Sequence, residues 1–158
     1  MLRFIGLVLC LIFVLNLNIY ALENPLVNIR QKLFEESQLI KPLLSSSKDV
    51  VLLNSFWDAL IMTVSQLDAY FSMLRIFNTI KKEALTEEAV KVLIDWLSMI
   101  KKTNELNLAS LHSLTINVEE DTKLHLDNLR QYYTELNTLI DIELNKHTII
   151  ITSLKTKR

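Results

Sequence analysis

The sequence predicts an all-α protein, an antiparallel up-down-up-down four-helix bundle with a short first helix and three long helices. Two observations lead to this fold class. Gly6 is the only glycine among the 158 residues. Because glycine usually supplies the positive φ of tight hairpins, a β-sandwich or barrel built from the rest of the chain would be very unusual. Apolar residues also recur at spacings of three and four along long segments, which is the periodicity of helices with one buried side.

The first 21 residues are expected to be a secretory signal peptide. Arg3 carries the positive charge, residues 4–15 form an uncharged apolar run, and a more polar stretch ends at the small residue Ala21. We place cleavage after Ala21, which leaves residues 22–158 as a single helical-bundle domain. The alternative is an uncleaved N-terminal membrane anchor, because apolar residues after position 15 could extend the run toward the roughly 20 residues of a membrane span.

The first helix of the bundle is expected over residues 25–44. Asn24 is a suitable N-cap, and Pro25 falls at the first helical position, where its missing N–H costs nothing. Pro42 should kink or close the helix. The expected inward residues are Leu26, Ile29, Leu33, Leu39 and Ile40.

The second helix is expected over residues 48–82, and it is the most apolar of the four. Its seam has spacings of four and three and consists of Leu53, Trp57, Leu60, Val64, Leu67, Phe71 and Leu74. Further apolar residues widen that seam, so the helix should be covered on most sides. Asp58, Asp68 and Arg75 interrupt the apolar run and argue against a membrane span.

Two more long helices are expected to complete the bundle. The third covers residues 87–115 after an N-cap at Thr86, and its polar middle, 101–105, is a place where it could bend or break. Its inward residues are Val90, Leu93, Trp96, Leu97, Ile100, Leu108 and Leu111. The fourth covers residues 118–154 after a capping box at Asn117. Its apolar seam is Leu126, Leu129, Tyr133, Leu136, Ile140, Leu144, Ile151 and Leu154.

Composition excludes several classes of function. Seventeen basic residues against eighteen acidic residues give a net charge of -1, which excludes a generally basic nucleic-acid binder. Without glycine after Gly6 there is no phosphate-binding loop. Without cysteine after Cys10 there is no thiol nucleophile, zinc–thiolate site or iron–sulfur cluster in the expected mature chain. We therefore assign no catalytic, cofactor-binding or metal-binding residue and expect no enzyme.

The three histidines and the large aromatic residues are the remaining candidates for chemistry. Asp121 and His125, like Glu143 and His147, stand four residues apart on one helix face, and we interpret such pairs as surface ion pairs rather than metal sites. His147 falls on the seam, where a hydrogen-bonded inner position is expected. The best available metal site, His112 with Asp121 and His125, would be open and weak. Pocket-lining roles are considered for three aromatic residues, although core packing is the favoured interpretation: Trp57, Trp96 and Tyr133.

The leading functional hypothesis is an exported, non-enzymatic interaction module. It would bind a protein partner, or a second copy of itself, through an exposed helical face. The alternative is a periplasmic or extracellular bundle that binds a small ligand or a metal. We expect a secreted or periplasmic location, no nucleic-acid partner, no cofactor, and a membrane association only if the N-terminal segment is not cleaved.

Overall fold

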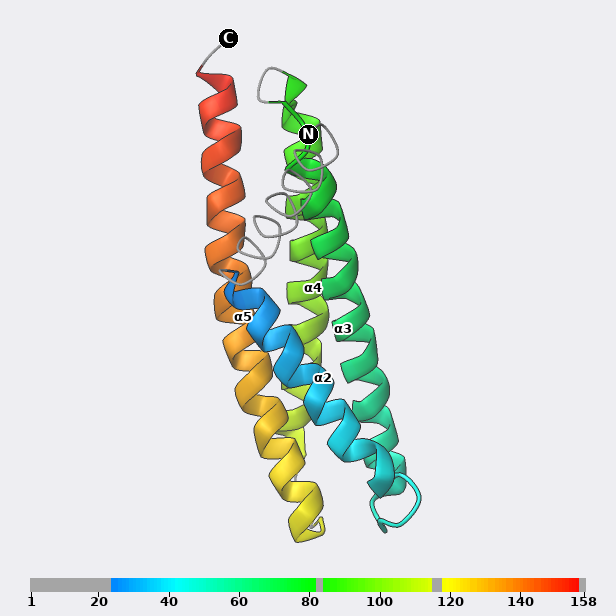
Figure 1. Cartoon of the computed structure of the whole chain (residues 1–158). Helices are drawn as coiled ribbons and strands as arrows, with labels where there is room; N and C mark the ends of the chain where they lie inside the picture. The colour runs from blue at the N-terminus through cyan, green and yellow to red at the C-terminus, as the bar shows by residue number, and fades with distance from the viewer. Residues whose placement is uncertain (1–23, 82–83, 115–117, 157–158) are drawn as a thin grey trace, which may run out of the picture.

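The computed structural model describes residues 24–81, 84–114 and 118–156, and every long element within these ranges is an α-helix. The predicted all-α fold class is therefore confirmed. The helices are α2 (Pro25–Leu43), α3 (Val50–Phe77), α4 (Glu87–Ser113) and α5 (Glu120–Lys155) (Figure 1). The expected signal peptide, residues 1–21, and the expected cap at Asn117 lie outside the described residues.

The four helices pack as a bundle around one apolar core. α4 packs most extensively on α5, α2 packs on both α3 and α5, and α3 packs on α4. Figure 1 shows α2 crossing obliquely over its neighbours, which extend further along the long axis of the bundle. Buried leucine and isoleucine side chains from all four helices form a continuous core cluster.

Local capping sets two helix starts where the sequence predicts them. The Asn24 side-chain oxygen accepts a hydrogen bond from the Leu26 N–H at 3.0 Å, with Pro25 opening α2. The Thr86 hydroxyl accepts from the Ala89 N–H at 3.2 Å at the start of α4. Side-chain oxygens at these positions satisfy backbone donors that have no partner inside the helix. Pro42 lies one residue before the end of α2, so the helix closes there.

The start of α5 is fixed by contacts with the start of α3. Glu119 is the N-cap of α5 and makes no side-chain cap bond. Its N–H donates instead to the Asp49 carboxylate at 2.8 Å, and its own carboxylate accepts from the Ser47 hydroxyl at 2.9 Å. The helix begins at Glu120, two residues later than expected, because these tertiary contacts hold Glu119 in extended backbone.

The polar middle of α4 does not interrupt the helix. Asn104 is completely buried and donates to the Tyr133 carbonyl and to the Asn137 side-chain oxygen, both at 2.7 Å. Lys101 pairs with Asp141 at 2.6 Å. The polar run over 101–105 therefore contains contacts between α4 and α5, and helix continuity places both residues opposite their partners.

The buried faces differ from the sequence prediction in α2 and α3. In α3, Phe56 and Tyr70 are buried where Trp57 and Phe71 were expected, and the last two are half-buried. The predicted seam shares four residues with the buried side of α3, which consists of Leu53, Phe56, Leu60, Thr63, Val64, Leu67 and Tyr70. In α2, Leu39 is 57% exposed, contrary to expectation.

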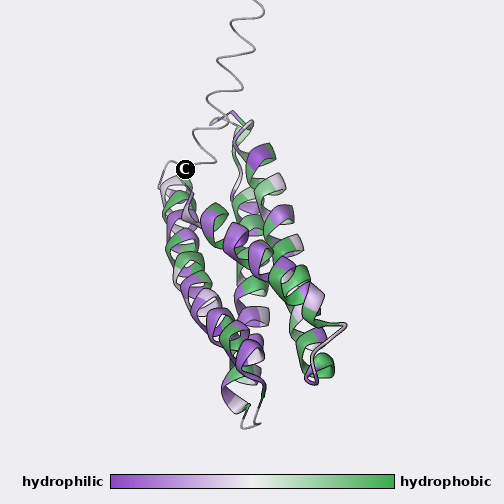
Figure 2. Ribbon diagram, turned by 60° about the horizontal axis from the view of Figure 1, so that its bottom comes forward, coloured by the Kyte–Doolittle hydropathy of each residue, from purple (hydrophilic) through white to green (hydrophobic). Residues whose placement is uncertain are grey.

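The outer side of α3 is less covered than expected. Val51 is 80% exposed, Ile76 is 66% exposed and Met62 is 45% exposed. Among the described residues, α3 is the helix that has the length and composition of a membrane span, yet only 33% of its most apolar window is buried. Apolar residues run along the whole of α3 in Figure 2. The bundle therefore leaves part of the apolar surface of α3 open to solvent.

Candidate functional site

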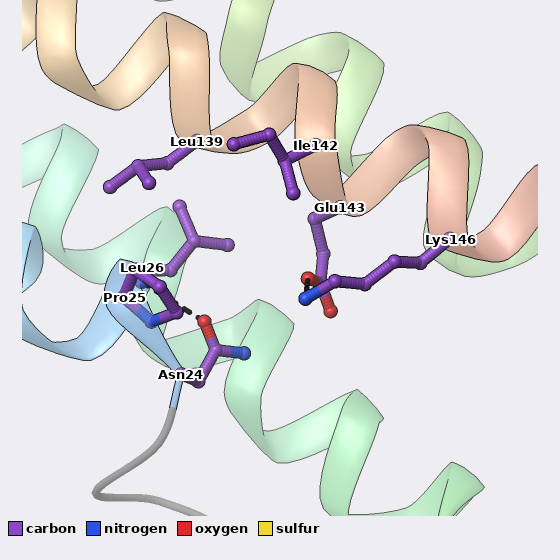
Figure 3. Close-up of a pocket in the computed structure, with 7 residues that line it drawn as sticks. All are labelled: Asn24, Pro25, Leu26, Leu139, Ile142, Glu143 and Lys146. Carbon is purple, nitrogen blue, oxygen red and sulfur yellow. Dashed lines mark hydrogen bonds and ion pairs between the residues drawn. The ribbon is translucent and has the colours of Figure 1, made fainter.

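A buried chain of polar side chains joins α3 to α5. The Tyr70 hydroxyl lies 2.9 Å from Nε2 of His147 and donates to the Glu143 carboxylate at 3.2 Å. The second Glu143 oxygen accepts from Lys146 at 2.8 Å. Tyr70 is completely buried, while His147 and Glu143 are 3% and 7% exposed. Figure 3 shows the outer end of this chain, where Lys146 reaches Glu143.

Burial decides the protonation of this cluster. It lowers the pKa of His147, against the smaller opposing effect of the Glu143 carboxylate. It also raises the pKa of Tyr70, and Glu143 raises it further. A neutral His147 therefore donates from Nε2 to Tyr70, whose single proton goes to Glu143. This arrangement leaves Nδ1 of His147 as a buried acceptor without a partner among the described residues.

The pocket beside this cluster is too small for an organic ligand. It lies between the start of α2 and the middle of α5, and its lining is drawn in Figure 3: Asn24, Pro25, Leu26, Leu139, Ile142, Glu143 and Lys146. The space suits about one water molecule. Tyr70 and His147 do not line it. The cluster therefore links α3 to α5 from positions that this pocket does not reach.

The other histidines do not form the pairs that the sequence suggested. His125 does not pair with Asp121. Its Nδ1 lies 2.5 Å from the carboxylate of Glu36, a residue of α2 that is 2% exposed. Asn128 donates to the second Glu36 oxygen at 3.2 Å. This buried carboxylate could not be predicted from the sequence, because its partners come from another helix.

A metal centre would need ligands that converge, and the described ranges hold no group of three or more histidine, cysteine, aspartate or glutamate residues able to bind one ion. His147 meets Glu143 through Tyr70 rather than in a direct ion pair. His112 lies exposed in the last turn of α4. The structure thus does not join His112, Asp121 and His125 into one cluster.

The large aromatic residues connect different pairs of helices. The Trp57 indole N–H donates to the Ser37 carbonyl of α2 at 3.0 Å, and the Trp96 indole N–H donates to the Gln66 carbonyl of α3 at 2.9 Å. Tyr133 is completely buried in the core. None of the three lines the pocket in Figure 3. Their positions agree with core and interhelical packing.

An exposed apolar surface surrounds the Trp96–Gln66 hydrogen bond. Met62 and Ala69 flank Gln66 on α3, four residues before it and three after it. Val92 and Met99 flank Trp96 on α4 in the same way. Two helical turns beyond Met99, Leu106 is 63% exposed, and Val92 and Met99 are 55% and 39% exposed. We call these residues the α3–α4 outer face: Met62, Ala69, Val92, Trp96, Met99 and Leu106.

The sequence has surplus apolar residues, but its periodicity does not predict this face. The available signal was the spacing of Val92, Met99 and Leu106, which are seven residues apart. The inward residues of α4 dominate the pattern and conceal this second stripe. Comparison of the chain with protein-family models, curated proteins and solved structures gave no match.

Proposed function

We propose that this chain is an exported, non-enzymatic interaction module that binds a protein, either a different partner or a second copy, through the α3–α4 outer face. The single observation that supports this most is the apolar face itself. Scattered apolar residues are normal on protein surfaces. Here, exposed apolar side chains of two neighbouring helices gather around one interhelical hydrogen bond, which is typical of a binding surface.

The proposal includes an up-down-up-down order of the helices. Contacts between distant parts of the chain support antiparallel neighbours. Lys155, at the end of α5, pairs with Glu87, at the start of α4, at 3.3 Å, and Lys101 pairs with Asp141 nearer the middle. In the same sense, Arg30 early in α2 pairs with Asp68 late in α3. Such an arrangement gives the outer face two long, roughly parallel ridges.

The ligand-binding alternative has less support. A small-molecule site usually encloses most of its ligand within a pocket of several hundred Å³. The pocket beside Glu143 has room for about one water molecule. The buried polar groups at Tyr70 and at Glu36 are bonded to one another, which favours a structural role for each cluster. Enzymatic activity is not part of the proposal for the same reason.

Export is the second component of the proposal. It rests on the charged start, apolar run and small residue at 21. Residues 22–158 contain no cysteine, so an exported form of this chain cannot be stabilised by disulfide bonds. Apolar packing must then hold its core together. The continuous core of four helices supplies that packing.

The test compares three forms of the chain in its native cell after mild crosslinking. A charge placed on the outer face, Met99→Glu, should abolish the crosslinked species formed by the wild type. Leu124→Glu places the same charge on an apolar residue of α5 that is 61% exposed and outside the face, and it should retain those species. Equal crosslinking of both variants, with folding verified by circular dichroism, would contradict the proposal.

A further inference from the structure

We infer that the outer face binds a second copy of this chain, with α4 packed antiparallel against α4 of the other copy around a two-fold axis near Met99. This inference rests on the proposed function and specifies its partner. The order of apolar and charged residues along the exposed side of α4 indicates this partner. That side extends from Val92 to Leu106, about 21 Å at the helical rise.

The exposed side of α4 has the spacing of a coiled-coil seam. Val92, Trp96, Met99, Thr103 and Leu106 follow one another at intervals of four, three, four and three residues. Val92, Met99 and Leu106 are exposed, and Trp96 and Thr103 are half-buried. Alternating intervals of this kind keep one side of a helix facing a partner helix over several turns. The seam therefore fits a helix as its occupant.

The charged residues beside this seam can form ion pairs with the same residues of a second, antiparallel copy of α4. Asp95 lies four residues before Met99, and Lys102 lies three residues after it, on the same flank of α4. Both are exposed, and neither has an ion-pair partner within the ranges that the structure describes. With the two-fold axis between Ser98 and Met99, reversal of the helix brings Asp95 opposite Lys102 of the second copy, and Lys102 opposite Asp95. A two-fold interface needs this self-complementarity.

The apolar residues follow the same symmetry. Val92 lies seven residues before Met99 and Leu106 lies seven residues after it, so the same reversal exchanges them to within one residue, about 1.5 Å along the helix. Met99 lies near the axis and meets its counterpart. A parallel two-fold arrangement would instead place the flank that carries Asp95 and Lys102 against the opposite flank of the second α4, whose apolar residues are buried in the core, so neither charge would meet a partner. The sequence order thus selects the antiparallel arrangement.

The test uses single and reciprocal charge reversals in protein purified after expression of the full printed sequence. Sedimentation equilibrium should give a dimer for the wild type. Asp95→Lys places two pairs of lysines across the interface, and Lys102→Asp places two pairs of aspartates there. Each variant alone should raise the dimer dissociation constant about tenfold or more. The double variant restores opposite charges and should return close to the wild-type constant.

Mixing the two single variants gives a stricter result. Asp95→Lys and Lys102→Asp present opposite charges to each other at both positions, so an equimolar mixture should form a one-to-one heterodimer at a concentration at which each variant alone is mostly monomeric. This result also demonstrates that both variants are folded. Lys123→Asp, at an exposed lysine of α5, is the matched control and should dimerise like the wild type.

Two outcomes would overturn the inference. The first would also contradict the proposed function, whereas the second would not. A wild-type monomer at all concentrations that binds anionic lipid vesicles would replace the second copy with a membrane surface, and it would contradict the proposed function as well. A dimer whose stability ignores all the charge reversals would reject the α4 interface. The crosslinking of Met99→Glu would then decide the proposed function independently.

Discussion

The Tyr70 hydroxyl and Nε2 of His147 lie 2.9 Å apart inside the bundle, linking α3 to α5. Phe77 packs edge-on against the same imidazole, with ring centroids 6.3 Å apart. These neighbours exclude water from a ring that can take up a proton. The free energy of unfolding of the bundle should therefore depend on pH through protonation of His147.

Acidification should destabilise the protein through His147. Burial lowers its pKa below the ordinary value of 6.5, so the unfolded chain takes up the proton more readily than the folded chain. The stability that neutral His147 contributes is fully present above pH 6.5, and it is lost as the pH falls through the lowered pKa of the folded protein. Urea midpoints measured at about pH 7.5 and about pH 5 should show a smaller decrease for His147→Gln than for the wild type.

The control for this effect is His112→Gln, because His112 is an exposed residue in the last turn of α4. On acidification, the stability of His112→Gln should decrease as much as the stability of the wild type. If His147→Gln and the wild type lose the same stability on acidification, His147 is not neutral in the folded protein, and the proton arrangement given above is wrong.

Leu97 and Trp57 should contribute differently to stability. Leu97 is completely buried, so Leu97→Ala should lower the free energy of unfolding by about 2–5 kcal/mol. Trp57 is half-buried and donates to the Ser37 carbonyl. Trp57→Phe keeps most of the ring and removes one hydrogen bond, which should cost about 0.5–1.5 kcal/mol. Denaturant titration measures both, and Ser98→Ala, next to Leu97 on the exposed side, should change little.

Helix starts and several core residues could be predicted from the sequence because they depend on local chemistry. The caps at Asn24 and Thr86 each satisfy a backbone N–H two or three residues later. A local pattern contains all the information needed for such a bond. The buried position of Leu97 likewise follows from its place on an apolar stripe of one helix.

Other features depend on residues far away in the chain. Glu36 is buried because His125 and Asn128, which are 89 and 92 residues later, bond to its carboxylate. Phe56 rather than Trp57 faces inward because the Trp57 indole reaches a carbonyl of α2. The outer face is missed because it depends on which side of α4 its neighbours leave open. The periodicity of the sequence predicts none of these contacts, because they join residues of different helices.

No tight transition-metal site is expected. A site without thiolates must be built from histidine and carboxylate ligands. Nδ1 of His125 is paired with Glu36, and Nε2 of His147 is bonded to Tyr70. His147 is also twenty-two residues beyond His125 on α5, about 33 Å along the helix. Elemental analysis of untagged protein after dialysis should find no bound metal. One equivalent of zinc, iron or copper would favour the metal-binding alternative.

The mature protein should begin at Leu22. The predicted cleavage follows Ala21, where a small residue ends the polar stretch after the apolar run. The intact mass of protein recovered from outside the cytoplasm should match residues 22–158. Recovery of the chain with residue 1 retained in the membrane fraction would instead support an N-terminal anchor.

The central claim is that the α3–α4 outer face is covered by another protein in the functional state. Methionine oxidation measures this directly, because Met62 and Met99 lie on the face and are 45% and 39% exposed in the isolated chain. In the native cell, both should be oxidised by peroxide several times more slowly than in purified protein diluted to a monomer. Met73, half-buried on α3, should change little. Equal rates for Met62 and Met99 under the two conditions would mean that the face stays open, and the account would be wrong.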